Sequence, residues 1–173
     1  MSAIRLSDLR AAQTRAARAS VVKSLGEARR LGRQTAFLCH SHKDHDLAEG
    51  LQVLFVEQGW EVYIDWQDTA LPDTPDAETA RKIKSKIEEL DWFLFLATPN
   101  SVVSRWCPWE IGYADKSKSH DKVLIVPTQD QSGTWYGNEY LKLYGRVEAA
   151  GTGGLAAFSE GARNGSWVRN LSG

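Results

Sequence analysis

The chain has 173 residues, of which 42% are apolar and 25% are charged, and its formal net charge is −1. This length and composition are typical of one globular domain with an appendage, and they exclude a disordered chain. No apolar run is long enough to span a bilayer, so we expect a soluble protein without a membrane partner.

The charge distribution and the cysteine content limit the kind of partner and the cellular location that we expect. Residues 1–33 carry a net charge of +6, which leaves −7 for the remainder of the chain. An acidic body argues against nucleic acid as the main partner. Only two cysteines occur, Cys39 and Cys107, and no secretory signal pattern is visible, so we expect a cytoplasmic location.

The first segment, residues 1–33, is predicted to be a basic amphipathic helix that precedes the main domain over residues 34–173. Small and apolar residues recur every three or four positions between residues 3 and 31, which predicts one long helix that Gly32 ends. A basic start of this kind also resembles an organellar transit peptide, but the acids Asp8 and Glu27 and the lack of a cleavage pattern argue against it.

The main domain alternates short apolar runs with amphipathic segments, which is typical of strands and helices in turn. The expected strands cover residues 35–39, 61–66, 92–97, 122–127 and, less distinctly, 146–149; the expected helices cover residues 45–58, 78–90, a segment that contains Glu110, and residues 155–162. This alternation predicts an α/β fold of the flavodoxin-like type, a three-layer sandwich around a five-stranded parallel sheet. The common strand order for five strands is 2-1-3-4-5, and the N-terminal helix is additional.

In this topology ligands bind at the carboxyl edge of the sheet, where the strand order reverses between the first and third strands. The polar turn from His40 to Asp44 follows the first strand, and residues 98–110 follow the third, so we expect the two to meet there. Asp44 is expected to cap the helix over residues 45–58, and Ser101 or Ser104 is expected to cap the helix that contains Glu110.

Trp106 and Glu110 are four residues apart, so both lie on one face of that helix. An indole beside a carboxylate at the binding edge is a plausible place for chemistry. The same spacing also fits a packed Trp106 and a solvated helix charge at Glu110. A carboxylate buried against indoles would have a raised pKa, and it could stabilise an oxocarbenium-like sugar.

Other site chemistries find less support in the sequence. Glycine-rich phosphate loops and a nucleophile elbow are absent, and no aspartate ends the third strand as a phosphoacceptor would. His40 and His42 lack a second pair of ligands to complete a metal site, so no metal is expected. Departure of nicotinamide from its ribose needs no acid, so a single carboxylate would suffice for that reaction.

Three blocks of sequence resemble the Toll/interleukin receptor (TIR) domain, in particular its small bacterial members. The first block runs from residue 35 to Asp44, and the second, residues 62–66, leads into the loop that the family calls the BB loop. The third block is Ser104 to Glu110, which matches the motif S-x-W-C-x-x-E. The resemblance covers roughly residues 34–150.

The resemblance implies a flavodoxin-like fold and an activity. Enzymatic TIR domains use the glutamate of this motif, here Glu110, to cleave the nicotinamide–ribose bond of NAD+, which gives ADP-ribose or a cyclic isomer. NAD+ is then the substrate, and no resident cofactor is expected. The positions that line the substrate cleft in the family match His40, Ser41, His42, Asp65, Trp66 and Trp106.

The resemblance also implies a biological role, and it leaves alternatives open. Bacterial members often act in antiphage defence, associate with themselves, and work with a separate effector or sensor protein. Many TIR domains are instead non-enzymatic adaptors, and an enzyme that acts on free nucleosides is a third possibility. The carboxylates of Asp65 and Glu139 are alternative catalytic groups, although each fits a loop or cleft-wall position better.

Overall fold

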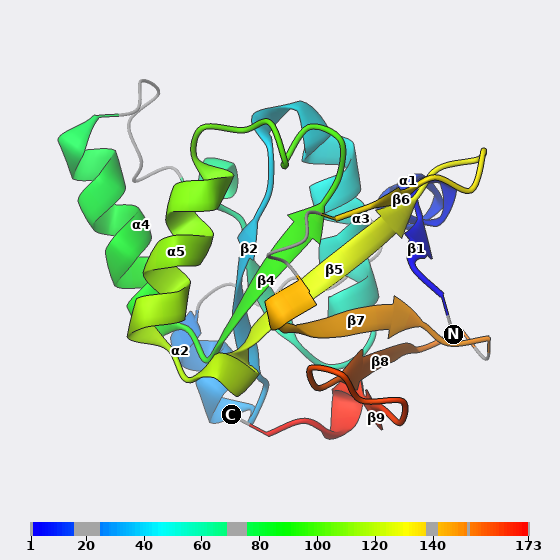
Figure 1. Ribbon diagram of the computed structural model, residues 1–173. Coiled ribbons are helices and arrows are strands. Elements are labelled where there is room, and N and C mark those ends of the chain that lie inside the picture. Colours follow the sequence, from blue (N-terminus) through cyan, green and yellow to red (C-terminus); the bar gives the residue numbers. More distant parts are fainter. Residues whose placement is uncertain (1, 16–24, 69–75, 138–141, 152, 173) are drawn as a thin grey trace.

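The computed structural model describes residues 2–15, 25–68, 76–137, 142–151 and 153–172 (Figure 1). Its centre is a parallel sheet with the strand order β3-β2-β4-β5-β7. These strands are β3 (Glu61–Tyr63), β2 (Thr35–Cys39), β4 (Trp92–Ala97), β5 (Val123–Gln129) and β7 (Gly145–Ala149). In chain order they are the five predicted strands, so the predicted order 2-1-3-4-5 holds for this parallel centre. The predicted strand count is wrong, because four further strands bring the sheet of the described residues to nine.

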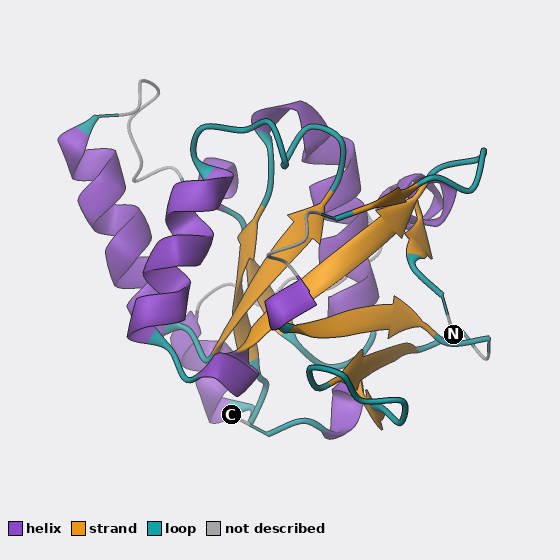
Figure 2. Cartoon of the chain, viewed as in Figure 1, coloured by secondary structure: helices purple, strands orange, loops and turns teal. Residues whose placement is uncertain are grey.

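Helices cover both faces of this sheet, as the predicted three-layer sandwich requires (Figure 2). The longer helices are α1 (Leu6–Gln13) and α3 (His45–Val56) on one face, and α4 (Ala77–Glu89) and α5 (Cys107–Ser117) on the other. Side chains alternate along each strand, so Leu38 of β2 packs in the core beneath α3, whereas Phe37 and Cys39 pack in the core beneath α4 and α5.

Short helical turns connect several of these elements. They are η2 (His42–Asp44), η3 (Asp65–Gln67), η4 (His120–Lys122) and η6 (Val168–Asn170). The second strand is therefore shorter than expected, because the chain turns into η3 instead of continuing to Trp66.

The predicted C-terminal helix near residues 155–162 is wrong. Residues there form β8 (Leu155–Phe158), which pairs antiparallel with β7 and carries β9 (Ser166–Trp167) on its other side. All four residues of β8 are buried, and a short apolar run of this kind fits a buried strand as well as a helix. A further strand, β6 (Trp135–Tyr136), pairs antiparallel with the end of β5.

The N-terminal segment differs from the single helix expected over residues 3–31. It begins with β1 (Ile4–Arg5), which pairs in parallel with the end of β5, and α1 follows. A separate helix, α2 (Leu25–Arg30), precedes β2, and residues 16–24 lie outside the described residues. Ile4 is buried in the sheet core. This burial favours the pairing of β1 with the end of β5 over an earlier start of the helix.

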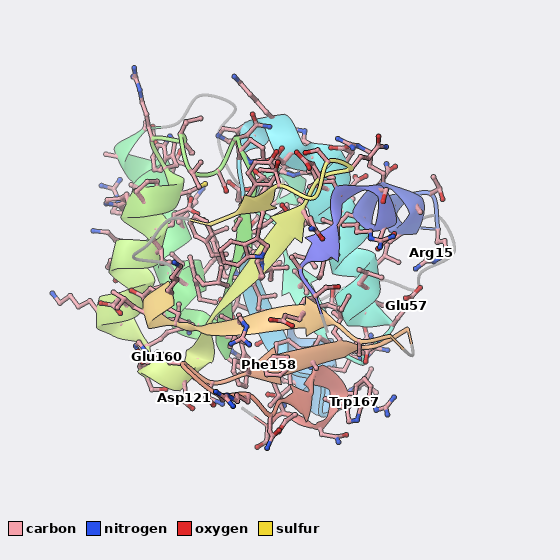
Figure 3. All side chains as sticks on the ribbon, turned by 45° about the vertical axis from the view of Figure 1, so that its right-hand side comes forward. Arg15, Glu57, Asp121, Phe158, Glu160 and Trp167 are labelled. Atoms are coloured by element: carbon pink, nitrogen blue, oxygen red, sulfur yellow. The ribbon has the colours of Figure 1, made fainter. Side chains whose placement is uncertain are left out.

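Helix α1 lies against α3, where Leu9 and Ala12 are buried. Exposed ion pairs flank this contact. Arg10 lies 3.0 Å from Asp46. Arg15 lies 3.1 Å from Glu57, and both of these residues are labelled in Figure 3. Exposed pairs of this kind stabilise little, so the buried side chains hold α1 in place. The division of the chain at residue 33, between α2 and β2, stays a prediction.

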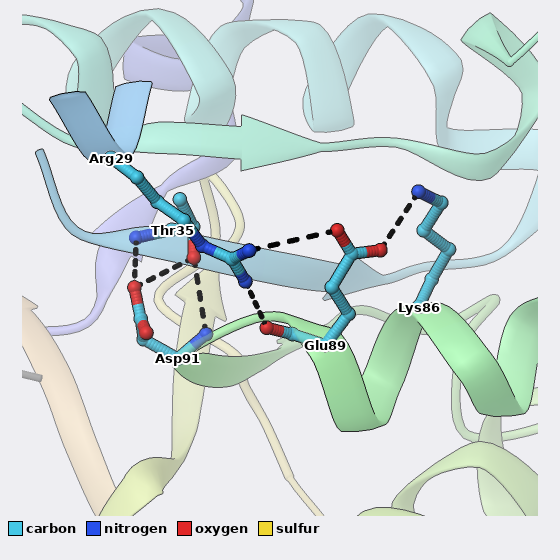
Figure 4. Close-up of polar contacts among 5 residues, drawn as sticks. All are labelled: Arg29, Thr35, Lys86, Glu89 and Asp91. Carbon is cyan, nitrogen blue, oxygen red and sulfur yellow. Dashed lines mark hydrogen bonds and ion pairs between the residues drawn. The ribbon is translucent and has the colours of Figure 1, made fainter. Parts of the chain in front are cut away.

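Polar contacts connect α2 to the start of the sheet (Figure 4). Arg29 donates a hydrogen bond of 2.5 Å to the carbonyl oxygen of Glu89, whose carboxylate lies 3.0 Å from Lys86. Beside it, the backbone N–H and the hydroxyl of Thr35 both donate to the carboxylate of Asp91, at 2.9 and 2.7 Å. These contacts fix the amino ends of β2 and β4, at the opposite edge from the candidate site.

Candidate active site

The turns after β2 and β4 meet at the carboxyl edge of the sheet, as the topology predicts. The buried carboxylate of Asp44 accepts hydrogen bonds from Thr98 Oγ1 at 2.5 Å and from Asn100 Nδ2 at 2.7 Å. The prediction that Asp44 caps α3 is therefore wrong. Asp44 is at the N-cap position of α3, but its side chain makes no capping hydrogen bond. Its carboxylate instead joins the two turns.

The segment between β4 and α5 is ordered by serine and threonine side chains. Ser101 Oγ accepts from the N–H of Thr98 at 2.8 Å, and the hydroxyl of Thr98 accepts from the N–H of Ser101 at 3.0 Å. Ser104 Oγ accepts from the N–H groups of Trp106 and Cys107 at 3.2 and 3.3 Å, so Ser104 orders the turn that leads into α5. The N-cap position itself is Trp106, whose side chain makes no capping hydrogen bond, so the expected serine cap is wrong. Pro108 lies in the first turn, where its missing N–H is not needed.

Glu110 lies in the first turn of α5 and is only 4% exposed. This excludes a solvated helix charge at this position. Burial raises the pKa of Glu110 to about 8, a hydrogen bond with the thiol of Cys39 opposes this rise, and the nearby groups Cys107 and Asp65 add to it. Cys39 ends β2, so the carboxyl group of Glu110 lies at the edge of the sheet that the topology nominates.

His40 and Asp65 lie at the ends of neighbouring strands and face each other. His40 Nδ1 lies 3.1 Å from the carbonyl oxygen of Leu38, and this contact requires that Nδ1 carry the proton. Burial lowers the pKa of His40, so the ring is neutral and its Nε2 is an acceptor. Nε2 is buried, has no hydrogen-bond partner among the described residues, and lies 3.8 Å from Asp65 Oδ1. A hydroxyl group could donate to either of these acceptors.

Aromatic side chains form a second part of the site. Trp66 is 37% exposed and stacks on His45, with ring centroids 4.6 Å apart and an interplanar angle of 23°. The ring of His42 meets His45 edge-on at 6.5 Å. Trp106 is half-buried at the start of α5 and contacts Trp109 edge-on at 5.4 Å.

The structure therefore divides the predicted site residues into groups. His40, Asp65 and Glu110 are brought together, and His42 and Trp66 meet through His45. Ser41 is buried, and its hydroxyl accepts from the N–H of Lys43 at 3.4 Å, which orders the turn.

Sequence reasoning missed two side chains in this region, Cys39 and His45. Strand alternation places Cys39 on the face of β2 beneath α5, so its position near that helix could have been predicted. Nothing in the sequence indicates the stacking of His45 on Trp66.

Two further features concern what the site could bind. Within the described part of the chain, no group of three histidine, cysteine, aspartate or glutamate residues lies close enough to hold a metal ion. Glu139, the alternative carboxylate, lies outside the described residues, as do residues 69–75 of the expected BB loop. None of the described helices is both long and apolar enough to cross a membrane.

Comparison with known proteins gives two matches. A family model described as the TIR domain matches residues 36–149. A probable 3′ cyclic ADP-D-ribose synthase, ThsB′ of Bacillus cereus (strain MSX-D12), is 34% identical over 118 residues, which are 67% of this chain. The same alignment covers 61% of that protein, so the chain spans less than two thirds of its length.

Proposed function

This chain belongs to the TIR domain family, and from that premise we propose that it is an enzyme that cleaves NAD+ between nicotinamide and ribose. Glu110 is its catalytic residue. The observation that carries this proposal is the burial of the Glu110 carboxyl at the carboxyl edge of the sheet, beside Cys39 and within the electrostatic reach of Asp65. An adaptor has no need of a buried carboxylate there, because an unpaired buried charge is costly.

The reaction needs little from the protein besides this carboxylate. The bond between ribose C1′ and the nicotinamide nitrogen breaks, and its electron pair stays on the nitrogen. Because the pyridinium ring is cationic in the substrate, nicotinamide leaves as a neutral molecule without a proton. The ribose becomes oxocarbenium-like, and the carboxylate of Glu110 stabilises its positive charge.

The other side chains of the site have roles that suit this substrate. The acceptors of His40 and Asp65, 3.8 Å apart, would bind a ribose hydroxyl, which can donate to one of them. Trp66, held by its stack on His45, offers its exposed face to a planar ring. Ser41 and His42 shape the turn beside these groups, and Trp106 flanks Glu110 on the same face of α5.

The product follows from what captures the ribose carbon. Water gives ADP-ribose, and a hydroxyl group of the same NAD+ molecule gives a cyclic isomer; in either case the attacking hydroxyl loses one proton. The name of ThsB′, a probable 3′ cyclic ADP-D-ribose synthase, supports the cyclic product. Self-association, a separate effector or sensor protein, and a role in bacterial antiphage defence belong to the same proposal.

The test is release of nicotinamide from NAD+, followed by chromatography over a range of protein concentrations. We expect release by the wild-type protein, loss of at least about a hundredfold in Glu110→Gln, and normal release by Glu57→Gln, an exposed glutamate at the C-cap of α3. The retention time of the second product distinguishes ADP-ribose from a cyclic isomer. An inert wild-type protein at every concentration would favour the adaptor, and activity on nucleosides alone would favour the third alternative.

A further inference from the structure

The turn η3 carries two side chains of the candidate site, Asp65 and Trp66, yet it has little structure of its own. It is a single helical turn of three residues that follows β3, and β3 lies at one end of the strand order. Within it, the N–H of Gln67 donates to the carbonyl oxygen of Ile64 at 3.2 Å, and the N–H of Asp68 donates to that of Asp65 at 2.9 Å. Hydrogen bonds within so short a turn fix its position poorly, so contacts from outside must hold it in place.

One such contact comes from Gln52, a polar residue on the buried face of α3 that is 8% exposed. Its Nε2 donates to the carbonyl oxygen of Val62 at 2.8 Å and to Oε1 of Gln67 at 3.0 Å. In return, Nε2 of Gln67 donates to Oε1 of Gln52 at 3.3 Å. The backbone carbonyl of Val62 can only accept, so it fixes which end of the Gln52 amide is the donor. Gln52 and Gln67 therefore form a reciprocal amide pair, the glutamine pair, which joins α3 to η3.

Packing alone does not require an amide at position 52. A buried amide is costly unless its polar atoms are hydrogen-bonded, and an apolar side chain of similar volume, such as methionine, would fill the same space without that cost. The bonds to Val62 and Gln67 satisfy both polar atoms of Gln52. What the amide adds to an apolar side chain is therefore a specific link from α3 to β3 and η3.

A second contact holds η3 from the opposite face of the sheet. The hydroxyl of Tyr63 donates to the carboxylate of Asp68 at 2.8 Å. The ring of Tyr63 lies 5.7 Å from that of Phe37 and packs against the core beneath α4 and α5. Asp65 and Trp66 lie between the glutamine pair and this contact in the chain, so both ends of their turn are tied to the body of the protein.

The position of η3 decides how its two side chains meet the segment from β2 to α3. Asp65 Oδ1 accepts from the N–H of Trp66 at 2.9 Å, which orients the carboxylate, and it lies 3.8 Å from Nε2 of His40. The indole of Trp66 stacks on His45, with ring centroids 4.6 Å apart. Both contacts run from η3 to that segment, so a shift of η3 away from α3 would disturb them together.

We propose that Gln52 is a positioning residue for the binding of NAD+: its amide pair with Gln67 holds η3 against α3. Asp65 and Trp66 thereby keep their places in the candidate site. The inference rests on the proposed function, in which these two side chains bind a ribose hydroxyl and a planar ring. Gln52 acts through η3, does not touch the substrate, and takes part in no bond that forms or breaks.

The deciding experiment measures how firmly η3 is held, because such a measurement does not depend on catalysis. Hydrogen exchange followed by NMR gives the protection factor of the Asp68 amide, which is bonded within the turn. We expect Gln52→Met and Gln67→Met each to lower this factor at least about threefold, since each removes both bonds of the glutamine pair. The double variant should lose little more than Gln52→Met alone, because the two substitutions remove the same bonds.

Gln13→Met is the matched control, because Gln13 also links α3 to a neighbouring element, through a hydrogen bond of 2.9 Å from its Nε2 to Glu49. Its protection factor at Asp68 should equal that of the wild-type protein. An equal loss in Gln13→Met would overturn the proposal, since the effect would then be a general loosening of α3. Unchanged protection in the variants of the glutamine pair would also overturn it. If Gln52→Met does not fold, Gln67→Met decides alone, because that side chain is exposed.

Enzyme kinetics then connect the glutamine pair to the substrate. We expect KM for NAD+ to rise at least about threefold in Gln52→Met and Gln67→Met while kcat stays within about twofold, because binding is weakened equally before and during cleavage. KM should not change in Gln13→Met. A fall in kcat at constant KM would contradict a role in substrate binding. If the wild-type protein does not cleave NAD+ at all, the proposed function fails, and hydrogen exchange still decides whether the glutamine pair holds η3.

Discussion

The carboxylate of Asp44 accepts a hydrogen bond of 2.5 Å from the hydroxyl of Thr98. Asp44 lies in the turn after β2 and Thr98 in the turn after β4, so this bond fixes one turn relative to the other. Both residues are buried, and a buried carboxylate must be satisfied by such donors. The candidate active site lies between these turns, so its geometry depends on this contact.

Replacing Asp44 with alanine should therefore destabilise the protein and reduce its activity. Two hydrogen bonds to a charged group would be lost, and the side chains of Thr98 and Asn100 would lose an acceptor. We expect the free energy of unfolding to fall by roughly 2–4 kcal/mol. Urea unfolding measures this change. Asp46→Ala is the control, because Asp46 lies in the same region and forms an exposed pair with Arg10, so its loss should cost less than about 1 kcal/mol. Equal losses in the two variants would contradict the role of Asp44.

The rate of NAD+ cleavage should rise with pH. The pKa of Glu110 is raised to about 8 by burial, so most of the free protein carries a protonated, inactive carboxyl at neutral pH. We expect kcat/KM to rise about tenfold per pH unit below about pH 8 and to reach a plateau above it. The limb of kcat should lie at lower pH, since a bound nicotinamide cation favours the carboxylate. A flat or falling profile of kcat/KM would count against Glu110 as the carboxylate that acts.

Much of the fold could be predicted, because long-range order follows from local pattern in an α/β sheet. The runs that became β2, β4 and β5 are short, apolar and separated by amphipathic segments, which leaves few topologies. The end of the chain is different. Leu155-Ala-Ala-Phe has no period that separates strand from helix, and its pairing with β7 decides the outcome. The pairing of Ile4 with Thr128 is equally invisible in sequence, because β1 has only two residues.

The location of the candidate site could be predicted from the sequence, but the contacts among its side chains could not. Topology alone indicates that His40 and Glu110 share one edge of the sheet, and the resemblance to the TIR domain supplies their roles. The actual partners depend on how the turns pack in three dimensions. Asp44 was expected to cap α3, but its carboxylate is taken by Thr98 and Asn100 of another turn. No local propensity indicates such a contact between distant residues.

Glu110 should make stability fall with rising pH, in contrast to an ordinary paired carboxylate. Its pKa in the folded state, about 8, lies above the ordinary glutamate value of 4.5 that it has in the unfolded chain. The folded protein therefore binds one more proton between these values, so the contribution of Glu110 is fully present below about pH 4.5 and is lost as the pH rises through about 8. The slope from this group is about −1.4 kcal/mol per pH unit within that window.

Urea unfolding at several pH values compares the wild-type protein with Glu110→Gln, which cannot ionise. The difference between their free energies of unfolding should grow in favour of the variant as the pH rises from about 5 to about 8. The comparison cancels the titration of every other group to first order. A constant difference across this range would mean that Glu110 titrates normally.

The contribution of the contact between α1 and α3 to stability can be tested with two helical glycines. One is in close contact with α1, and the other faces open space. A Cβ added to Gly50 of α3 would stand 1.9 Å from the carbonyl oxygen of Leu9, whereas a Cβ added to Gly112 of α5 would have no atom within 4 Å. Gly50→Ala should force α1 away from α3 and lower the free energy of unfolding by about 1–3 kcal/mol. Gly112→Ala should raise it by up to about 1 kcal/mol, because alanine is the better helix former. Urea unfolding gives both values, and hydrogen exchange of the α1 amides shows whether the loss in Gly50→Ala is local to that contact. Equal effects of the two substitutions would mean that the close approach of α1 to α3 contributes nothing to stability.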